Sequence, residues 1–241
     1  MKRVDGIRAV TYDCWGTLLK DRDWEGAMAI RQSALCRFLP DLSDEECKEL
    51  LNEAWARHDE AWKQIETFGP GRMAAYCLEA RGIEDDESIN QLTREFETAS
   101  IETGVDAVEG ALEVLAALKS AGIRRGLVCD TGFTPGTVVR ELLADNGLLE
   151  FLEVLCFSDE VGVPKPGAEI FDKALAELGV RPPEAIHIGD LKRTDIAGAH
   201  NVGMHAVRFR GVHDDRSDFP EARVAIDRHE ELLEVLGLTD S

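Results

Sequence analysis

The chain has 241 residues, of which 27 are Lys or Arg and 47 are Asp or Glu, so its formal net charge is −20. Nucleic acids and anionic membrane surfaces bind basic patches, and this excess of carboxylates argues against both as partners. With 44% hydrophobic and 31% charged residues, the chain suits one large globular domain or a core with a smaller inserted domain.

No apolar stretch approaches the roughly 20 residues that a membrane-spanning helix needs, and the first residues lead into a strand-like segment instead of a signal peptide. We therefore expect a cytoplasmic protein. The six cysteines lie far apart without a CxxC pair, which fits neither a zinc site nor a disulfide scaffold. We expect most of them to be small core residues.

The first expected element is a buried strand over residues 7–12, which ends at Asp13. From about residue 105 onward, strand-like and helical patterns alternate, and several helical patterns end at a glycine. This alternation is typical of right-handed βαβ units, so we predict an α/β fold with a doubly wound, Rossmann-like parallel sheet. Later strands are expected at 126–129, 154–157, 185–188 and 205–209, and helices at 108–119, 136–143, 168–178, 195–201 and 230–236.

The segment between the first strand and the alternating region differs in pattern. It lacks a convincing strand, Ser43 to Glu46 has the form of a capping box, and Trp55 and Trp62 are two turns apart on one helix face. We predict an all-helical cap domain over 21–103 and an α/β core domain formed by 1–20 and 104–241. A cap inserted after the first strand is expected to act as a lid over the strand ends.

Side chains that could take part in a chemical reaction follow the ends of the expected strands. In an open parallel sheet, ligands bind beyond the carboxyl ends of the strands, so we expect these side chains to gather at one edge. Gly16 would allow the sharp turn that brings Thr17 back beside Asp13. The residues are Asp13 and Thr17, Asp130 and Thr131, Lys165, and Asp190 and Asp195.

This set of side chains is suited to phosphoryl transfer. Carboxylates at close quarters repel one another unless a cation neutralises them, and Mg²⁺ prefers a few carboxylates, a carbonyl and waters. A lysine and a hydroxyl would then hold an anionic substrate whose charge the metal also screens. We therefore expect a Mg²⁺ cofactor and a small anionic substrate.

The order and spacing of four motifs resemble those of the haloacid dehalogenase (HAD) superfamily of hydrolases. The first is Asp13-x-x-Gly-Thr17, and the second lies around Asp130 and Thr131. Lys165 is the third, and Gly189-Asp190-xxxx-Asp195 is the fourth. The helical insertion resembles the cap that this family inserts after the first core strand.

The resemblance implies that Asp13 is the nucleophile and forms a covalent aspartyl intermediate. It also implies that Asp13, Asp190 and the backbone carbonyl of Trp15 bind Mg²⁺, with Asp195 in support through water or as a neighbouring acid. Trp15 is thus an expected metal ligand through its main chain.

The resemblance gives Thr17 and Lys165 the task of steadying Asp13 and the transferring group. In the second motif the family usually has Ser or Thr directly at the strand end. Here Cys129, Asp130 and Thr131 compete for that place, and we favour Thr131 as the donor.

The sequence departs from the phosphatase pattern at Trp15. Phosphatases of the family usually have a second Asp there, which protonates the leaving group, and loss of a general acid typically costs about 10²–10⁴-fold in rate. The 2-haloacid dehalogenases have an aromatic residue at this position, but they generally have a Ser-Asn type sequence at the place of Gly189-Asp190 and Tyr at the place of Phe171, whereas this sequence keeps both acids of the fourth motif. Mg²⁺-dependent phosphoryl hydrolysis is favoured, and the alternatives are 2-haloacid dehalogenation or a catalytically impaired binding or regulatory protein.

Other residues complete the expectations. Trp15, Asp130 and Arg72 are the expected substrate contacts, with Arg72 on a cap loop. His187 is interpreted as a core histidine within a strand. The expected oligomeric state is a monomer or a homodimer.

Overall fold

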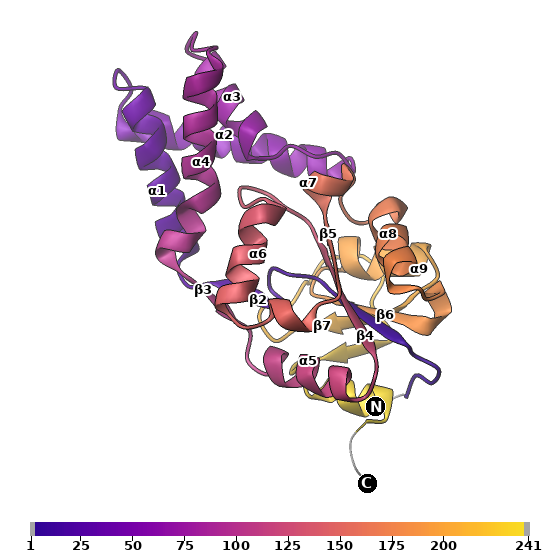
Figure 1. The fold of residues 1–241 in the computed structure, drawn as a ribbon. Coiled ribbons are helices and arrows are strands. Elements are labelled where there is room, and N and C mark those ends of the chain that lie inside the picture. Colours follow the sequence, from indigo (N-terminus) through magenta and orange to yellow (C-terminus); the bar gives the residue numbers. More distant parts are fainter. Residues whose placement is uncertain (1–2, 239–241) are drawn as a thin grey trace. The chain divides into compact units, whose positions relative to one another are not determined.

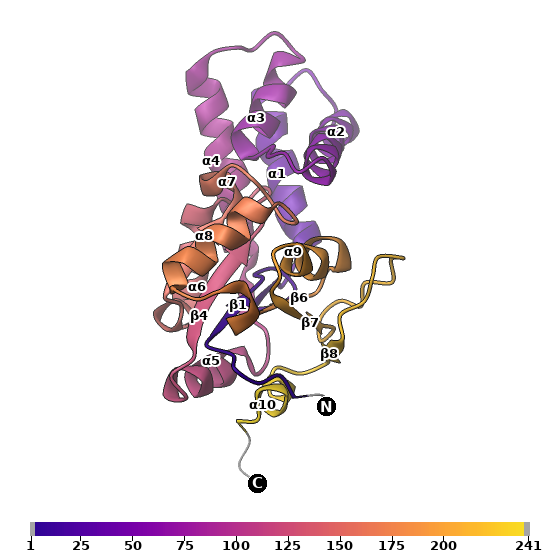
Figure 2. The same ribbon diagram turned by 90° about the vertical axis from the view of Figure 1, so that its right-hand side faces the viewer.

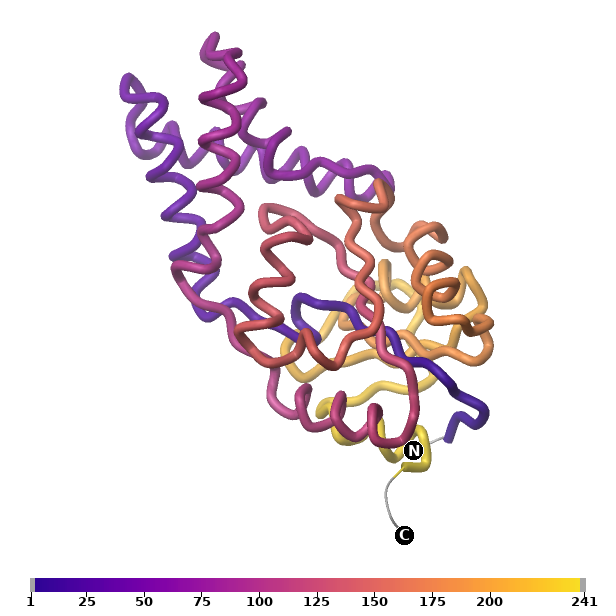
Figure 3. The backbone as a smooth tube through the Cα atoms, viewed as in Figure 1, coloured from indigo at the N-terminus to yellow at the C-terminus, as the bar shows by residue number. Residues whose placement is uncertain are grey.

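The computed structural model describes residues 3–238, which form two compact units. Figure 3 traces the backbone from one unit into the other and back. Residues 1–2 and 239–241 lie outside the described chain. The division into core and cap at the expected boundaries stays a prediction. Residues 131–142, which were expected in the core domain, group with the helical unit. The core unit comprises Met1–Lys20, Asp106–Asp130 and Leu143–Ser241, and the helical unit comprises Asp21–Val105 and Thr131–Leu142.

The core unit is built on a six-stranded sheet in the order β5-β4-β1-β6-β7-β8, in which every neighbouring pair is parallel (Figure 1). This sheet, flanked by helices, confirms the predicted α/β fold. A separate pair of short strands, β2 (Leu19–Asp21) and β3 (Val105–Ala107), lies where the chain passes between the units. The six strands are β1 (Ala9–Tyr12), β4 (Arg124–Cys129), β5 (Val154–Phe157), β6 (Ala185–Gly189), β7 (His205–Phe209) and β8 (Val224–Ile226).

The central strands are buried on both faces, as a parallel sheet covered by helices requires. Helix α8 packs its apolar residues, Phe171 among them, on β4 and β5, and α9 continues the same apolar cluster (Figure 2). The structure places a π-helical turn (Lys192–Ile196) before α9, where one continuous helix was expected. The helices are α5 (Ala111–Ser120), α6 (Gly136–Asp145, which crosses the unit boundary), α7 (Ser158–Val161), α8 (Ala168–Leu178), α9 (Ala197–Asn201) and α10 (Glu231–Leu236), with short 3-10 turns at Leu149–Phe151 and Pro182–Glu184.

The helical unit has its own apolar core, to which Leu51, Met73, Phe96 and Phe133 contribute. The predicted capping box at Ser43 is confirmed, because Ser43 N donates to Glu46 Oε2 (2.8 Å) and Glu46 N donates to Ser43 Oγ (3.4 Å). The helices of this unit are α1 (Trp24–Phe38), α2 (Asp44–Lys63), α3 (Pro70–Glu79) and α4 (Asp86–Thr103).

Two expectations about chain class can be compared with the structure. Within residues 3–238, no helix combines the length and apolarity needed to cross a membrane. All six cysteines are free, and five of them are buried, as expected for small core residues.

A tight turn after β1 brings Thr17 back toward Asp13. Thr17 N, Leu18 N and Leu19 N all donate to the carbonyl of Cys14, and Gly16 adopts a φ of +79°. A Cβ atom at position 16 would lie 2.8 Å from Asp190 Oδ2. Both the backbone conformation and the space therefore call for glycine here.

The C-terminal region is tied to the same turn by His229. Its Nε2 lies 2.9 Å from the carbonyl oxygen of Thr17, so Nε2 donates, and its ring stacks on Phe209 with centroids 4.3 Å apart. Burial lowers the pKa of His229 below the ordinary 6.5. The folded chain therefore holds this imidazole neutral.

The Gly16 turn is tested by replacement with alanine. Gly122 has a similar φ of +72° with nothing near its missing Cβ, so Gly122→Ala reports the backbone cost alone, about 1–2 kcal/mol. We expect Gly16→Ala to lower the free energy of unfolding in urea by more than this control does, because its methyl group meets a buried carboxylate. Equal losses in the two variants would contradict the close packing of Gly16 against Asp190.

The His229 contact predicts a pH dependence of stability. A lowered folded pKa means that the unfolded chain binds the proton first, so the contribution of His229 is complete above pH 6.5 and is lost below it. As the pH falls from about 7.5 to 5.5, this one group is therefore expected to lower the free energy of unfolding. His229→Gln retains a donor for the Thr17 carbonyl and should flatten this slope, whereas the exposed His213→Gln should keep it. An unchanged slope in His229→Gln would refute the assignment.

Candidate active site

Three carboxylates gather at the carboxyl edge of the core sheet. Asp13 follows β1 and Asp190 follows β6, and these strands are hydrogen-bonded neighbours with Tyr12 opposite Ile188. Each of Asp13, Asp190 and Asp195 offers a carboxylate oxygen within 4.8 Å of the others, and all three residues are buried. The predicted convergence of the first and fourth motifs is therefore present in the structure.

Lys165 is the cation of this cluster. Its Nζ donates to Asp13 Oδ1 at 2.5 Å and to Asp195 Oδ1 at 2.7 Å, and the residue is only 2% exposed. Burial alone would lower the pKa of Lys165, but the carboxylates of Asp13, Asp195 and Asp130 outweigh it and hold the pKa well above its ordinary value. The ammonium is therefore charged, and it fixes the relative positions of two acids.

Asp195 is fully engaged by neighbouring groups. Its Oδ1 also accepts from His187 Nε2 at 3.1 Å, and its Oδ2 accepts from Leu191 N at 3.0 Å. Burial would raise its pKa, but Lys165 and His187 hold it below the ordinary value. Asp195 is thus a stable anion that orients Lys165.

His187 has the structural role expected of a core histidine, and it adds a link to the site. The ring is fully buried, and burial lowers its pKa although Asp195 opposes that effect. A neutral ring that donates from Nε2 to Asp195 must accept at Nδ1, where Thr11 Oγ1 lies 2.9 Å away. The tautomer is therefore set from both sides.

Asp13 and Asp190 carry the unbalanced charge of the cluster. Burial, with the negative charge of Asp195 in addition, raises the pKa of Asp13 to about 7 although Lys165 opposes it. Burial and then the charges of Asp13 and Asp195 raise the pKa of Asp190 to about 9. One lysine does not balance three buried carboxyl groups, so Asp190 holds a proton at neutral pH when no cation is near, and a bound cation would take the place of that proton.

The remaining residues of the first and second motifs fall into different places. Thr17 Oγ1 donates to Asp13 Oδ2 at 3.2 Å, as the first motif predicts. Asp130 lies in the core unit, and its Oδ1 accepts a hydrogen bond from Lys165 N at 2.8 Å. Cys129, the residue before it, is buried. Thr131, the favoured donor of the second motif, groups with the helical unit instead of the core unit, so its proposed role stays a prediction.

Two expected substrate contacts have different surroundings. Trp15 is half-buried in the turn after β1. Arg72 was expected on a loop, but proline at the first helical position starts α3 at Pro70, so Arg72 lies in the first turn of that helix. Its Nη1 donates to the carbonyl of Thr67, and its guanidinium lies 4.7 Å from the centroid of the Phe68 ring. Their roles as substrate contacts remain predictions.

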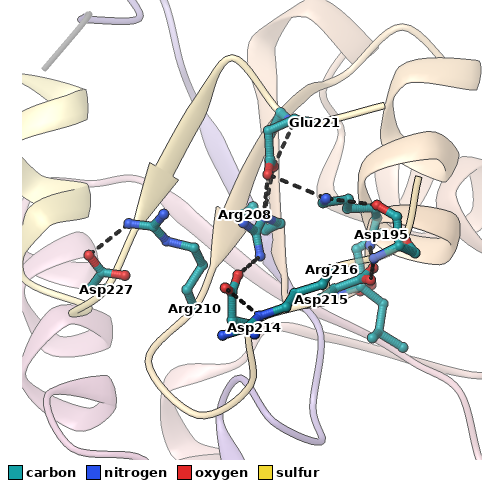
Figure 4. A network of polar contacts seen from close by, with 12 residues as sticks. Asp195, Arg208, Arg210, Asp214, Asp215, Arg216, Glu221 and Asp227 are labelled. Atoms are coloured by element: carbon teal, nitrogen blue, oxygen red, sulfur yellow. Dashed lines mark hydrogen bonds and ion pairs between the residues drawn. The ribbon is translucent and has the colours of Figure 1, made fainter. Parts of the chain in front are cut away.

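A polar network beside the site was not foreseen from the sequence (Figure 4). Arg208, with a side chain 5% exposed, donates from Nε to both carboxylate oxygens of Glu221 at 2.7 and 2.8 Å, and from Nη1 to Asp214 at 2.8 Å. Lys192, in the π-helical turn that contains Asp195, donates its backbone N–H to Asp215 at 2.7 Å. The network ties the segment 211–223 to β7 and to the turn that holds Asp195.

Comparisons with known proteins extend these observations. Residues 7–203 match the haloacid dehalogenase-like hydrolase family. A glyceraldehyde 3-phosphate phosphatase of Methanopyrus kandleri is 37% identical over 131 residues, which are 52% of this chain and 54% of that protein. The chain spans about half the length of the curated relatives it matches.

Solved structures share the fold over nearly the whole chain. A HAD phosphatase from Thermococcus onnurineus is 24% identical with a TM-score of 0.68, and the match covers 96% of this chain and 98% of that one. A 2-haloacid dehalogenase from Pseudomonas syringae is 22% identical with a TM-score of 0.69 and the same coverage. The family match, together with the carboxylates and the lysine at the sheet edge, identifies this chain as a member of the haloacid dehalogenase-like hydrolase family.

Proposed function

We propose that this hydrolase is a Mg²⁺-dependent phosphatase that acts on a small phosphorylated metabolite through an aspartyl intermediate on Asp13. The observation that carries the proposal is the buried cluster of Asp13, Asp190 and Asp195 around a single lysine. Curated relatives named as phosphatases support this activity over the others that the family includes.

The donor set fits Mg²⁺. Carboxylate oxygens within 4.8 Å of one another are the hard ligands that this ion prefers, and the cluster has more negative than positive charge. Asp13, Asp190 and the Trp15 carbonyl would hold the ion, with Asp195 in support because its two oxygens already bind Lys165, His187 and Leu191 N. When bound, Mg²⁺ supplies charge neutralisation and polarises the phosphoryl oxygens.

Asp13 performs the covalent step. Its carboxylate oxygen forms a bond to phosphorus while the bond from phosphorus to the leaving oxygen breaks, so the leaving group departs as its anion and an aspartyl phosphate remains. Water then attacks the phosphorus, which releases inorganic phosphate and restores the Asp13 carboxylate. Thr17 and Lys165 hold one carboxylate oxygen each, so the nucleophile is oriented before the substrate arrives.

Trp15 limits the range of substrates. Its indole cannot protonate a leaving oxygen, and the position two residues after the nucleophile is where phosphatases of this family usually have that acid. The proposal therefore favours phosphates whose leaving group needs little help from a proton, such as acyl or aryl phosphates.

Dehalogenation of 2-haloacids is the second candidate, favoured by Trp15 alone. A halide leaves without a proton, so an aromatic side chain at this position costs that reaction nothing. Asp190 argues against it, because a buried carboxylate beside Asp13 without a metal repels the nucleophile's own charge. The third candidate is a binding or regulatory protein that has lost catalytic turnover.

Asp13→Asn tests the nucleophile. We expect phosphate release from p-nitrophenyl phosphate to fall by about 10³-fold or more, because an amide oxygen does not attack phosphorus effectively. Chelation of Mg²⁺ with EDTA should abolish wild-type release as well. The exposed Asp41→Asn is the matched control and should keep full activity. Substantial turnover by Asp13→Asn would refute the proposed mechanism.

Trp15→Asp tests the missing acid. If the lack of a proton donor limits the reaction, this variant should hydrolyse an alkyl phosphate such as glycerol phosphate about tenfold faster or more, with a smaller gain on p-nitrophenyl phosphate, whose leaving group needs little help from a proton. Trp15→Phe, which removes the indole without adding an acid, should show no such gain. Equal rates in the two variants would mean that proton donation at this position is not limiting.

A further inference from the structure

A depression in the core unit lies away from the carboxylate cluster. It has a volume of about 640 Å³ and includes His205, the first residue of β7, and Val224, the first residue of β8. Asp190 instead follows the carboxyl end of β6, whose last residue, Gly189, pairs with Arg208. The depression therefore lies at the amino edge of the sheet, opposite the edge that holds Asp13 and Asp190.

The depression reverses the charge of the protein around it. The whole chain has a net charge of −20, yet four of the residues lining this depression are basic and one is acidic. The basic residues are Arg3, His200, His205 and Arg223, and the acid is Asp5. We call the site that they line the basic depression. Such a local concentration of positive charge attracts anions.

Most of these basic side chains have no protein partner. Arg3 pairs with Asp5, from Nε to Oδ1 at 2.7 Å, on an exposed surface. Within residues 3–238, the side chains of His200, His205 and Arg223 have neither a hydrogen bond nor an ion pair, although other exposed arginines, such as Arg210 and Arg181, do. Their donors are free to bind a ligand.

The basic groups are close enough to influence one another. Burial lowers the pKa of His200, and the positive charges of Arg223 and His205 lower it further. An anion in the depression would relieve this repulsion. The N-terminal segment, which supplies Arg3, Val4 and Asp5 to the lining, is held to α10 because Val4 N donates to the carbonyl of Val235. Figure 2 shows the start of the chain beside α10.

We propose that the basic depression binds a phosphate group, either as free phosphate or as the phosphate of a small metabolite. A guanidinium can bind two oxygens of either a carboxylate or a phosphate, but the donors of Arg3, His200, His205 and Arg223 together can reach more oxygens than the two of a carboxylate, which favours a phosphate. A polyanion such as nucleic acid is excluded by the acidic surface of the rest of the chain. This site is independent of the proposed catalytic function.

The test uses the histidine ring signals of the full chain in NMR spectra. The Asp13→Asn variant prevents hydrolysis, and inorganic phosphate is titrated at constant ionic strength, with glycerol phosphate and acetate in parallel. His200 and His205 report the basic depression, while His187, bonded to Asp195, reports the catalytic cluster. We expect His200 and His205 to shift saturably with phosphate and not with acetate.

A second variant assigns the binding to Arg223. Adding Arg223→Gln should weaken phosphate binding about tenfold or more at His200 and His205, and leave the response of His187 unchanged. Arg228→Gln, which removes an exposed arginine paired with Glu231, is the control and should bind as before. Binding of glycerol phosphate but not of free phosphate would identify a metabolite as the ligand.

Three results would overturn the proposal. If no site exists, the signals of His200 and His205 will not respond to phosphate or to glycerol phosphate. If any anion suffices, acetate will shift them equally. If Arg223 takes no part, Arg223→Gln will leave the titration unchanged. If the wild type showed no catalysis, the phosphate titrations at His200 and His205 could still be measured, so the two proposals are tested separately.

Discussion

The buried ammonium of Lys165 is the interaction on which the site depends. It lies between Asp13 and Asp195, at 2.5 and 2.7 Å, in a region with almost no access to water. Removing either partner from such a pair leaves a buried charge uncompensated, which is far more costly than breaking a surface ion pair. Because three carboxyl groups share one lysine, the cluster favours an additional cation.

The fold positions the carboxylates that surround Lys165 through backbone geometry. Parallel pairing of β1 with β6 fixes the distance between the chain segments that hold Asp13 and Asp190. The glycine turn after β1 then returns Thr17 to the nucleophile, and His229 holds the Thr17 carbonyl from the far end of the chain. The nucleophile is therefore oriented by rigid elements, which is what a preorganised site requires.

The sequence predicted the parts of the structure that have local signals. Alternating strand and helix patterns gave the α/β fold, and four strand-end motifs gave Asp13, Lys165, Asp190 and Asp195. It did not predict β8, whose three residues are too short for a periodic pattern. The contact of His229 with Thr17 joins residues far apart in sequence, which no local pattern encodes. Capping chemistry at Pro70, which starts α3, overrode the expected loop around residue 72.

A paired assay tests the central claim most directly, that the carboxylate cluster makes this family member a metal-dependent phosphatase. Phosphate release from aryl and acyl phosphates and halide release from 2-haloacids would be measured on the same preparation, each with Mg²⁺ and with EDTA. The account predicts phosphate release that requires Mg²⁺ and no halide release. Halide release that persists in EDTA would contradict it, and Trp15 would then outweigh Asp190 in setting the reaction.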